Sequence, residues 1–214
     1  MKPIAVVHSL FKEKFSIPRQ PGLISLESRI ELISPYNRSE ALVGLGDFSH
    51  VWLIFSFHEI AENFDLNLSV RPPRLGGNKK IGVFASRSPF RPNRLGLSLV
   101  KLERIEGANL IVSGGDLLDQ TPIYDIKPYL KEIECVPEAT SGWTSENVFE
   151  KLTVEYACHV DEELKKMITE VLSLDPRPSY HEDQYKRYGS RLGHFDVHWE
   201  VRDNKIIVID ITKI

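Results

Sequence analysis

Short hydrophobic runs with a period of two constrain this chain more than any other feature of its sequence. Gly, Pro, Asn and Asp gather between the runs. Such alternation is typical of strands that bury one face, and close spacing between turn residues is typical of antiparallel barrels and sandwiches. We therefore predict a mainly β protein built on an antiparallel β-barrel, with strands over Ile4–His8, Arg29–Ile33, Val51–Phe57, Ile81–Ala85, Leu97–Leu102, Leu110–Ser113 and Lys151–Val160.

Two segments depart from this pattern and favour helices. Ser39–Leu45 opens with Ser39, which can cap free backbone amides, and Glu40 follows at the positive end of the helix dipole. Glu162–Leu174 shows apolar residues at three-and-four spacing behind Asp161, which is the expected N-cap. Both segments are predicted to be helical.

The C-terminal part of the chain is organised differently. After a polar loop, apolar residues alternate over Phe195–Val201, Asp203-Asn204 suits a tight turn, and Ile206–Ile211 returns as a second strand. The length of 214 residues fits one domain with a small appendage. We place the boundary at about residue 140, so that residues 1–140 form a barrel domain. Residues 141–214, called the tail below, form a small α+β domain with a helix and a β-hairpin.

Composition and segment lengths exclude several classes of protein. With 42% hydrophobic and 27% charged residues, the chain has the composition of a globular protein and not of a disordered one. The longest apolar run, Val51–Phe57, is far shorter than the ~20 residues of a membrane span, and no signal sequence follows Met1. We therefore expect a cytoplasmic protein without a membrane segment. Cys135 and Cys158 are too few for a disulfide framework or a zinc site, and we expect free thiols.

Charge is unevenly distributed along the chain. The formal net charge is −3, but residues 66–102 contain no Asp or Glu and carry eight Lys and Arg, which leaves −11 on the rest. A stretch of this kind repels itself unless something compensates its charge. It favours a phosphate-rich partner, and the alternative is pairing with carboxylates elsewhere in the fold.

Familiar cofactor and metal motifs are missing from the sequence. Residues 44–46 lack the third glycine of a dinucleotide-binding fingerprint, and residues 76–77 lack the frame of a P-loop. His194 and His198 fall four residues apart on a predicted strand, which separates them by about 13 Å. They cannot share one metal ion at that distance, and no metal is expected.

Arginine and proline gather in three predicted loops. Proline restricts the backbone and arginine offers a two-pronged cation, so these loops are ordered in advance for binding. They equally suit structural turns in which arginine donates to backbone carbonyls. A further stretch holds Asp116, Asp119 and Asp125 beside glycines and prolines, where carboxylates also serve as Asx-turn acceptors. The three loops are Pro18–Pro21, Arg71–Gly77 and Ala85–Gly96.

The order and spacing of these loops resemble the TrmO family, S-adenosylmethionine-dependent methyltransferases that act on N6 of threonylcarbamoyl-adenosine at position 37 of the tRNA anticodon loop. The resemblance covers nearly the whole chain. It rests on Pro18-Arg-Gln-Pro-Gly-Leu23, Phe48-Ser-His-Val-Trp52, Arg71–Gly77, Gly82–Asn93, Gly96–Leu99, Asp116–Asp119, Asp125–Tyr129 and, in the tail, Asp175–Tyr180.

The resemblance implies a small non-Rossmann β-barrel methyltransferase that works as a homodimer and binds S-adenosyl-L-methionine in its barrel domain. A carboxylate of Asp116 or Asp119 can hold amino or ribose hydroxyl groups, and Arg19 or Arg87 can pair with the carboxylate of the cofactor. The implied cofactor-binding residues are Arg19, Gln20, Pro21, His58, Glu59, Arg87, Leu97, Asp116, Leu117, Leu118 and Asp119.

The implied reaction depends on positioning more than on acid–base chemistry, because a sulfonium already carries an activated methyl group. The accepting nitrogen is a poor nucleophile, so loss of its proton near the transition state would help. Asp119, Asp116 and His58 are the candidate bases, and the sequence does not choose among them.

The basic stretch and the tail supply the expected RNA contacts. Arginines and lysines of the stretch would hold phosphates of the anticodon loop, and the tail interleaves cations with aromatic rings, as recognition of single-stranded RNA requires. Packing of the tail aromatics against the barrel is the alternative. The predicted RNA-binding residues are Arg71, Arg74, Lys79, Lys80, Arg91 and Arg94, with Arg177, Tyr180, His181, Tyr185 and Lys186 in the tail.

Two other functions remain possible from the sequence. A non-catalytic RNA-binding β-barrel module would bind tRNA and not S-adenosylmethionine. A methyltransferase that acts on a small molecule would bind the cofactor and show no salt-dependent affinity for tRNA.

Overall fold

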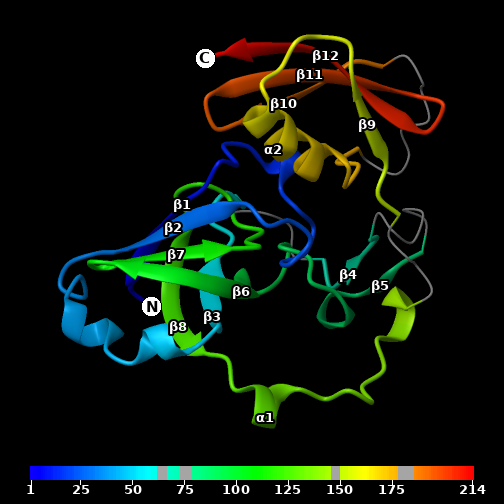
Figure 1. The fold of residues 1–214 in the computed structure, drawn as a ribbon. Helices are drawn as coiled ribbons and strands as arrows, with labels where there is room; N and C mark the ends of the chain where they lie inside the picture. Colours follow the sequence, from blue (N-terminus) through cyan, green and yellow to red (C-terminus); the bar gives the residue numbers. More distant parts are fainter. Residues whose placement is uncertain (62–66, 73–78, 146–149, 178–185) are drawn as a thin grey trace.

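The computed structural model describes residues 1–61, 67–72, 79–145, 150–177 and 186–214. Within these ranges, six antiparallel strands close into a barrel in the order β1-β2-β7-β6-β3-β8 (Figure 1). The predicted antiparallel barrel is confirmed. Its strands are β1 (Ala5–His8), β2 (Glu27–Leu32), β3 (His50–Ser56), β6 (Leu95–Glu106), β7 (Asn109–Ser113) and β8 (Pro122–Pro128).

The barrel core follows from the alternation seen in the sequence. In β3, Val51, Leu53 and Phe55 are buried and the residues between them are half-buried. Since successive side chains of a strand point to opposite faces, these three enter the barrel interior. There they join apolar residues such as Ile30 and Leu110 from the other strands.

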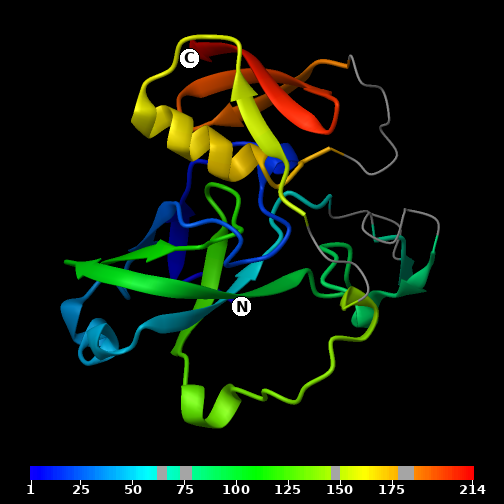
Figure 2. The ribbon, with the colours of Figure 1, turned by 45° about the vertical axis from the view of Figure 1, so that its right-hand side comes forward.

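The tail forms a second sheet with the order β10-β11-β12-β9. Helix α2 (Glu162–Leu172) lies between this sheet and the barrel (Figure 2). The predicted N-cap is confirmed, because Asp161 Oδ1 accepts a hydrogen bond from the Leu164 backbone at 2.9 Å. The hairpin turn is confirmed too, with φ of 47° at Asp203 and 59° at Asn204. The strands are β9 (Thr153–Tyr156), β10 (Tyr188–Leu192), β11 (Phe195–Arg202) and β12 (Lys205–Lys213).

Several boundaries differ from the prediction. Helix α2 ends two residues early, and the predicted strand Lys151–Val160 shortens to β9, which pairs parallel with β12 in the tail sheet. Strand β10 was not predicted, so the tail sheet has one strand more than the three that the sequence predicted for it. The remaining elements are β4 (Ser69–Val70), β5 (Ile81–Gly82), α1 (Lys131–Glu134) and the 3-10 turns η1 (Lys14–Ser16), η2 (Ser39–Leu42), η3 (Leu45–Asp47), η5 (Val83–Ala85) and η6 (Gly142–Thr144).

Two local predictions were wrong. The segment at Ser39 is a short 3-10 turn whose N-cap is Arg38, and no side chain caps it. The predicted strand Ile81–Ala85 stops at Gly82, because the chain then turns through η5.

The segment between β1 and β2, residues 9–26, joins the barrel to the tail; we call it the bridging segment. Phe11 and Ile24 are buried in the tail core with Ile168 and Trp199. Ser16 Oγ bonds to Ser190 Oγ at 2.7 Å, and the indole of Trp199 donates to the same Ser190 oxygen at 2.9 Å. N-terminal residues thus complete the hydrophobic core of the tail, and the boundary near residue 140 remains a proposal.

Replacing Gly96 by Ala should destabilise the protein by about 1–3 kcal/mol, the usual cost of overpacking a core. A Cβ on Gly96 would lie 2.2 Å from the ring of Phe55, which is buried. Chemical denaturation measures the change in the free energy of unfolding. Gly82→Ala is the matched control, because nothing lies within 4 Å of its Cβ position; equal effects of the two substitutions would contradict the packing described.

Candidate functional site

The bridging segment meets the barrel at a close backbone contact. Gly22 donates from its backbone N to the carbonyl oxygen of Gly114 at 2.8 Å, and both glycines have φ of 77°. A left-handed backbone of this kind favours glycine. A Cβ on Gly114 would also lie 3.5 Å from the backbone of Gly22. The contact sets the loop Pro18–Gly22 beside the turn that carries Asp116 and Asp119.

A carboxylate and an arginine lie at this junction. Asp116 accepts a hydrogen bond from Ser98 Oγ at 2.5 Å, and Arg87 Nη1 donates to Gln20 Oε1 at 2.7 Å. Burial raises the pKa of Asp116, while the Ser98 hydrogen bond and the charge of Arg87 oppose that rise. We call these residues, Gln20, Arg87, Ser98 and Asp116, the Arg87 cluster. The cluster offers a cation, an amide and a carboxylate to one ligand.

Asp119 lies on the same turn in a different electrostatic environment. Its carboxylate accepts from the backbone N of Ser9 at 2.9 Å and pairs with Lys12 Nζ at 2.7 Å. Burial alone acts to raise the pKa of Asp119, but the hydrogen bonds from Lys12 and Ser9 hold it below its usual range. Both oxygens of Asp119 therefore have partners in the bridging segment.

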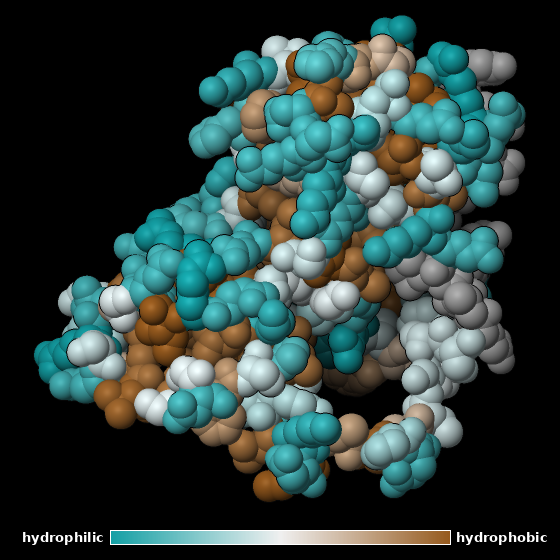
Figure 3. All heavy atoms as spheres, in the orientation of Figure 1, coloured by the Kyte–Doolittle hydropathy of each residue, from teal (hydrophilic) through white to brown (hydrophobic). Residues whose placement is uncertain are grey.

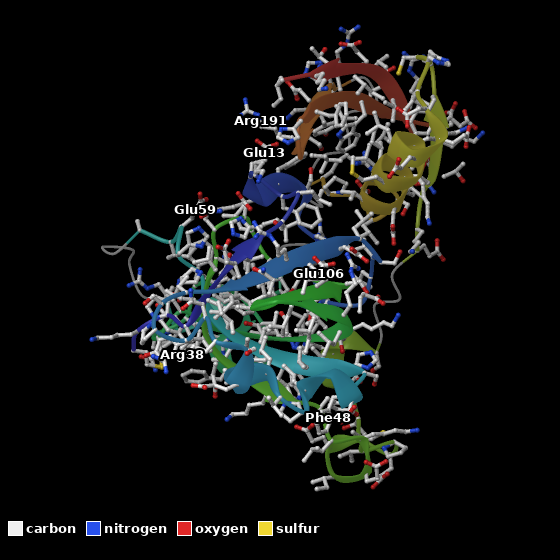
Figure 4. All side chains as sticks on the ribbon, turned by 60° about the vertical axis from the view of Figure 1, so that its left-hand side comes forward. Glu13, Arg38, Phe48, Glu59, Glu106 and Arg191 are labelled. Carbon is white, nitrogen blue, oxygen red and sulfur yellow. The ribbon has the colours of Figure 1, made fainter. Side chains whose placement is uncertain are left out.

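His58 and Glu59 follow the end of β3. Nδ1 of His58 lies 3.4 Å from Thr121 Oγ1. Burial lowers the pKa of His58 against the opposing charge of Glu59, so the imidazole is neutral near neutral pH. Glu59 pairs with Lys14 of the bridging segment at 3.3 Å. Figure 4 shows Glu59 on the side of the barrel that faces Glu13.

The leucines of the predicted site play different parts. Leu117 and Leu118 are buried, and Leu117 belongs to the barrel core, so they anchor the turn. Leu97 is 53% exposed, whereas the neighbouring Ser98 is 1% exposed. Strand β6 thus turns a serine inward and a leucine outward, because Ser98 meets Asp116. Pro21 is half-buried in the Gly22 loop.

Arg19 points away from the Arg87 cluster. Its Nη2 donates to the backbone carbonyl oxygen of Arg177, in the tail, at 2.8 Å. Burial lowers the pKa of the Arg19 guanidinium, and the charge of Asp175 opposes this. The structure therefore separates Arg19 from Arg87, although the adjacent Gln20 bonds to Arg87.

Two arginines of the basic stretch donate to backbone carbonyls, Arg91 within its own loop and Arg94 to the segment after β3. Arg91 Nη1 donates to the carbonyl oxygens of Ser86 and Ser88 at 3.2 and 3.4 Å. Arg94 Nη1 donates to the carbonyl oxygen of Ile60 at 3.0 Å. These contacts match the structural alternative considered for arginine-rich loops.

The other predicted RNA contacts fall into two groups. Arg71, Lys79, Lys80 and Lys186 are exposed, and Lys186 Nζ lies 5.7 Å from the ring centroid of Tyr188. Arg177, by contrast, pairs with Asp175. The residues outside the described parts of the chain are Arg74, Tyr180, His181 and Tyr185.

Some residues that shape the site were not predicted: Ser9, Lys12, Ser98 and Trp143. The Trp143 indole donates to the carbonyl oxygen of Ala85 at 2.8 Å, which joins the start of the tail to the Arg87 loop. Ser98 carries a usable signal, since it is the polar residue within the run Leu97-Ser-Leu99. The other three act through contacts distant in sequence.

Within the described ranges, no three His, Cys, Asp or Glu side chains are placed to hold a metal ion. No described helix is long and apolar enough to cross a membrane.

The fold and site together define a closed antiparallel β-barrel protein with a polar side-chain cluster beside the bridging segment, distinct in topology from the Rossmann proteins. Residues 6–135 match the model of the tRNA-methyltransferase O N-terminal domain, and residues 145–214 match that of the TrmO C-terminal domain. The chain belongs to the TrmO family.

Similarity to individual members extends over both parts of the chain. The chain is 42% identical to the tRNA (adenine(37)-N6)-methyltransferase of Escherichia coli K12, over 94% of this chain and 92% of that protein. It is 41% identical to the putative S-adenosylmethionine-dependent methyltransferase RcsF of Pseudomonas aeruginosa, over 99% of this chain and 96% of that protein. A crystal structure of TrmO from Pseudomonas aeruginosa superposes with a TM-score of 0.80 at 36% identity, over 99% and 97% of the two chains.

The two carboxylates of the site turn should affect stability with opposite signs. Asp116→Asn is expected to stabilise the protein at about pH 7, because burial makes the charged form unfavourable on folding. The difference from wild type should shrink as the pH falls below the raised pKa, and it should vanish only below the ordinary pKa range of aspartate, where the unfolded chain is protonated as well.

Asp119→Asn is expected to destabilise the protein by about 1 kcal/mol at the same pH, because the Lys12 pair is lost. That difference persists above about pH 4 and disappears as the pH falls through the lowered pKa. Urea denaturation of both variants across this pH range measures the effect, and two shifts of the same sign would refute the assignment of environments.

Proposed function

We propose that this protein is an S-adenosylmethionine-dependent methyltransferase that methylates N6 of adenine 37 in tRNA. The observation that carries the proposal is full-length similarity to the Escherichia coli enzyme named for that reaction. The alignment runs through both barrel and tail, so it does not rest on one shared domain.

The Arg87 cluster has the donors and acceptors that such a cofactor requires. S-adenosylmethionine carries a carboxylate, an ammonium group and ribose hydroxyls, and when bound it supplies a methyl group activated by the sulfonium. Asp116 suits the hydroxyl or amino groups, and the Gln20 amide can donate while its oxygen accepts from Arg87. The raised pKa of Asp116 marks a carboxylate that gains from a bound donor.

Arg87 is the better candidate than Arg19 for the cofactor carboxylate. Arg87 is exposed and bonds only one side-chain oxygen among the described contacts. Arg19 is committed to the Arg177 carbonyl. Arg87 can therefore add a carboxylate partner without breaking a contact between barrel and tail.

His58 is the best placed of the three candidate bases. Both oxygens of Asp119 are engaged, and Asp116 lies in the cofactor cluster. His58 is neutral near neutral pH, and within the described residues no hydrogen bond is found for its Nε2. It can accept the proton that the N6 group loses as the carbon–nitrogen bond forms, while the cluster fixes the line of attack.

The acceptor is the threonylcarbamoyl form of adenosine 37. Its carbamoyl group makes the N6 proton more acidic, which suits a weak base such as histidine. Arg71, Lys79 and Lys80 are exposed, and none of them forms an ion pair within the described part of the chain, so they suit contacts with phosphates of the anticodon loop. Because the target base lies in a loop, it needs to be unstacked but not unpaired. The protein acts where tRNA is modified, in the cytoplasm.

A homodimer would cover the apolar residues that the barrel leaves at its surface. Phe84 and Leu97 flank the loop Ala85–Gly96 and Phe90 lies within it, and all three are at least half exposed. Ile133 and Val136 are also exposed, in the segment that arches away from the barrel around an opening (Figure 3). Exposed apolar groups of this kind mark contact surfaces.

Purified protein incubated with S-adenosylmethionine and tRNA should add one methyl group to the threonylcarbamoyl nucleoside. Nucleoside mass spectrometry on marked and unmarked tRNA measures this. No methylation should be found on unmarked tRNA. Methylation of unmarked adenosine alone would overturn the choice of acceptor, and methylation of neither would overturn the reaction.

The same assay tests the proposed base. His58→Gln should lower kcat about 100-fold, the order expected for loss of a general base, with cofactor affinity unchanged by calorimetry. Asp119→Asn is the matched control and should keep kcat within a few-fold. A large loss in Asp119→Asn with full activity in His58→Gln would reverse the assignment.

Replacing Lys79 and Lys80 by Gln should weaken tRNA binding and reduce the dependence of affinity on salt. The slope of log K against log salt concentration is negative, and each lost phosphate contact should make it shallower by about one. Fluorescence anisotropy with labelled tRNA at several salt concentrations measures the slope. Lys205→Gln is the control, since Lys205 pairs with Glu155 in the tail sheet at 2.6 Å; an unchanged slope in the double variant would exclude these lysines from the RNA surface.

A further inference from the structure

The contact between Arg19 and the tail is unusual for a residue in a proposed cofactor loop. The Arg19 guanidinium, which is half-buried, donates to the backbone carbonyl oxygen of Arg177 at 2.8 Å. The two residues are 158 positions apart. A half-buried guanidinium needs partners for its donors, so this bond ties the bridging segment to the tail.

The turn that presents this carbonyl is fixed by its own ion pair. Arg177 Nε donates to Asp175 Oδ1 at 2.7 Å, and Arg177 Nη2 donates to Asp175 Oδ2 at 2.8 Å. The side chains are only 15% and 29% exposed. Asp175 has φ of 45°, a left-handed conformation that a short polar side chain tolerates. The two-pronged pair holds this turn in one geometry.

The same loop packs on apolar residues at the end of α2. Pro18 and Leu23 line a hollow with Val171, Leu174 and Pro176. The loop thus touches the tail through Pro18 and Arg19, and its next residue, Gln20, bonds Arg87. A shift of the Arg177 carbonyl would therefore be transmitted to the Arg87 cluster through Arg19, the residue next to Gln20.

We propose that Asp175 and Arg177 are positioning residues for the cofactor site, which act through Arg19 and Gln20 and make no contact with RNA. The proposal rests on the proposed function of the Arg87 cluster. The edge of the Arg177 guanidinium that would grip a phosphate is already occupied by Asp175. A phosphate would have to displace a paired, largely buried carboxylate, which is unfavourable.

Asp175→Asn in the full-length protein tests the proposal, because asparagine keeps the left-handed turn but cannot form the charged pair. Calorimetry with S-adenosylmethionine should show about tenfold weaker binding, the effect of losing one charge-assisted contact. In steady state, the KM for the cofactor should rise while kcat at saturation stays near wild type. The slope of tRNA affinity against salt should be unchanged.

Arg177→Lys separates the two possible roles. Lysine keeps the positive charge that a phosphate contact uses, but it cannot make the two-pronged pair. A positioning role predicts weaker cofactor binding in Arg177→Lys with wild-type tRNA affinity. Glu155→Gln is the control, because it removes an exposed carboxylate with the same charge as Asp175 from the tail sheet. It should change the affinity neither for S-adenosylmethionine nor for tRNA. Thermal unfolding checks that each variant is folded.

Three outcomes would overturn the proposal. One is unchanged cofactor affinity in both variants. Another is a salt slope that becomes shallower by about one when Arg177 is replaced by Gln, which removes the charge; that result would make Arg177 an RNA contact. The third is cofactor binding weakened equally by Glu155→Gln, which would mean a general effect of tail charge. Failure of the wild-type protein to bind S-adenosylmethionine would instead defeat the proposed function itself.

Discussion

The bridging segment between β1 and β2 is held from two sides, and the placement of the site depends on this. Toward the tail, Phe11 and Ile24 are buried in the second core, and Gly193 donates from its backbone to the carbonyl oxygen of Leu10 at 2.7 Å. Toward the barrel, Gly22 bonds to Gly114. Since both cores hold the segment, Gln20 is brought to Arg87 with little freedom left to lose on binding.

The site turn shows how one fold makes two carboxylates differ. Asp116 and Asp119 are three residues apart, yet one meets a serine hydroxyl in a buried position and the other meets a lysine and a backbone amide. Burial without a bonded cation raises the pKa, and a bonded cation lowers it. A buried carboxylate that is costly for folding is well suited to gain from a ligand, whereas Asp119 serves to fix the turn to the bridging segment.

Local sequence patterns predicted most of the fold. Alternation predicted five of the six barrel strands, and the spacing behind Asp161 predicted α2. Strand β8 was missed because Pro122, Asp125 and Pro128 are turn-type residues. Only its pairing with β1 and β3 makes it a strand, and that pairing is not visible in a local window.

The site was harder to predict than the fold, because it also depends on contacts between residues that are distant in sequence. Motif resemblance brought out Gln20, Arg87 and Asp116, which the structure joins through contacts between them or with Ser98. It also grouped Arg19 with them, although Arg19 bonds to a residue of the tail. Neighbours distant in sequence decide which way a long side chain turns, and no spacing rule contains that information. The sequence analysis missed Lys12 for the same reason, since its partner Asp119 is distant in sequence.

The central claim is that the bridging segment, clamped by the tail, presents the cofactor-binding cluster on the barrel. A crystal structure of the protein with S-adenosylhomocysteine tests it most directly. The account predicts that the ligand carboxylate pairs with Arg87, that Asp116 accepts from a hydroxyl or amino group, and that Arg19 still donates to the Arg177 carbonyl. A ligand bound away from Gln20, Arg87 and Asp116, or an Arg19 released from the tail to bind it, would contradict the account.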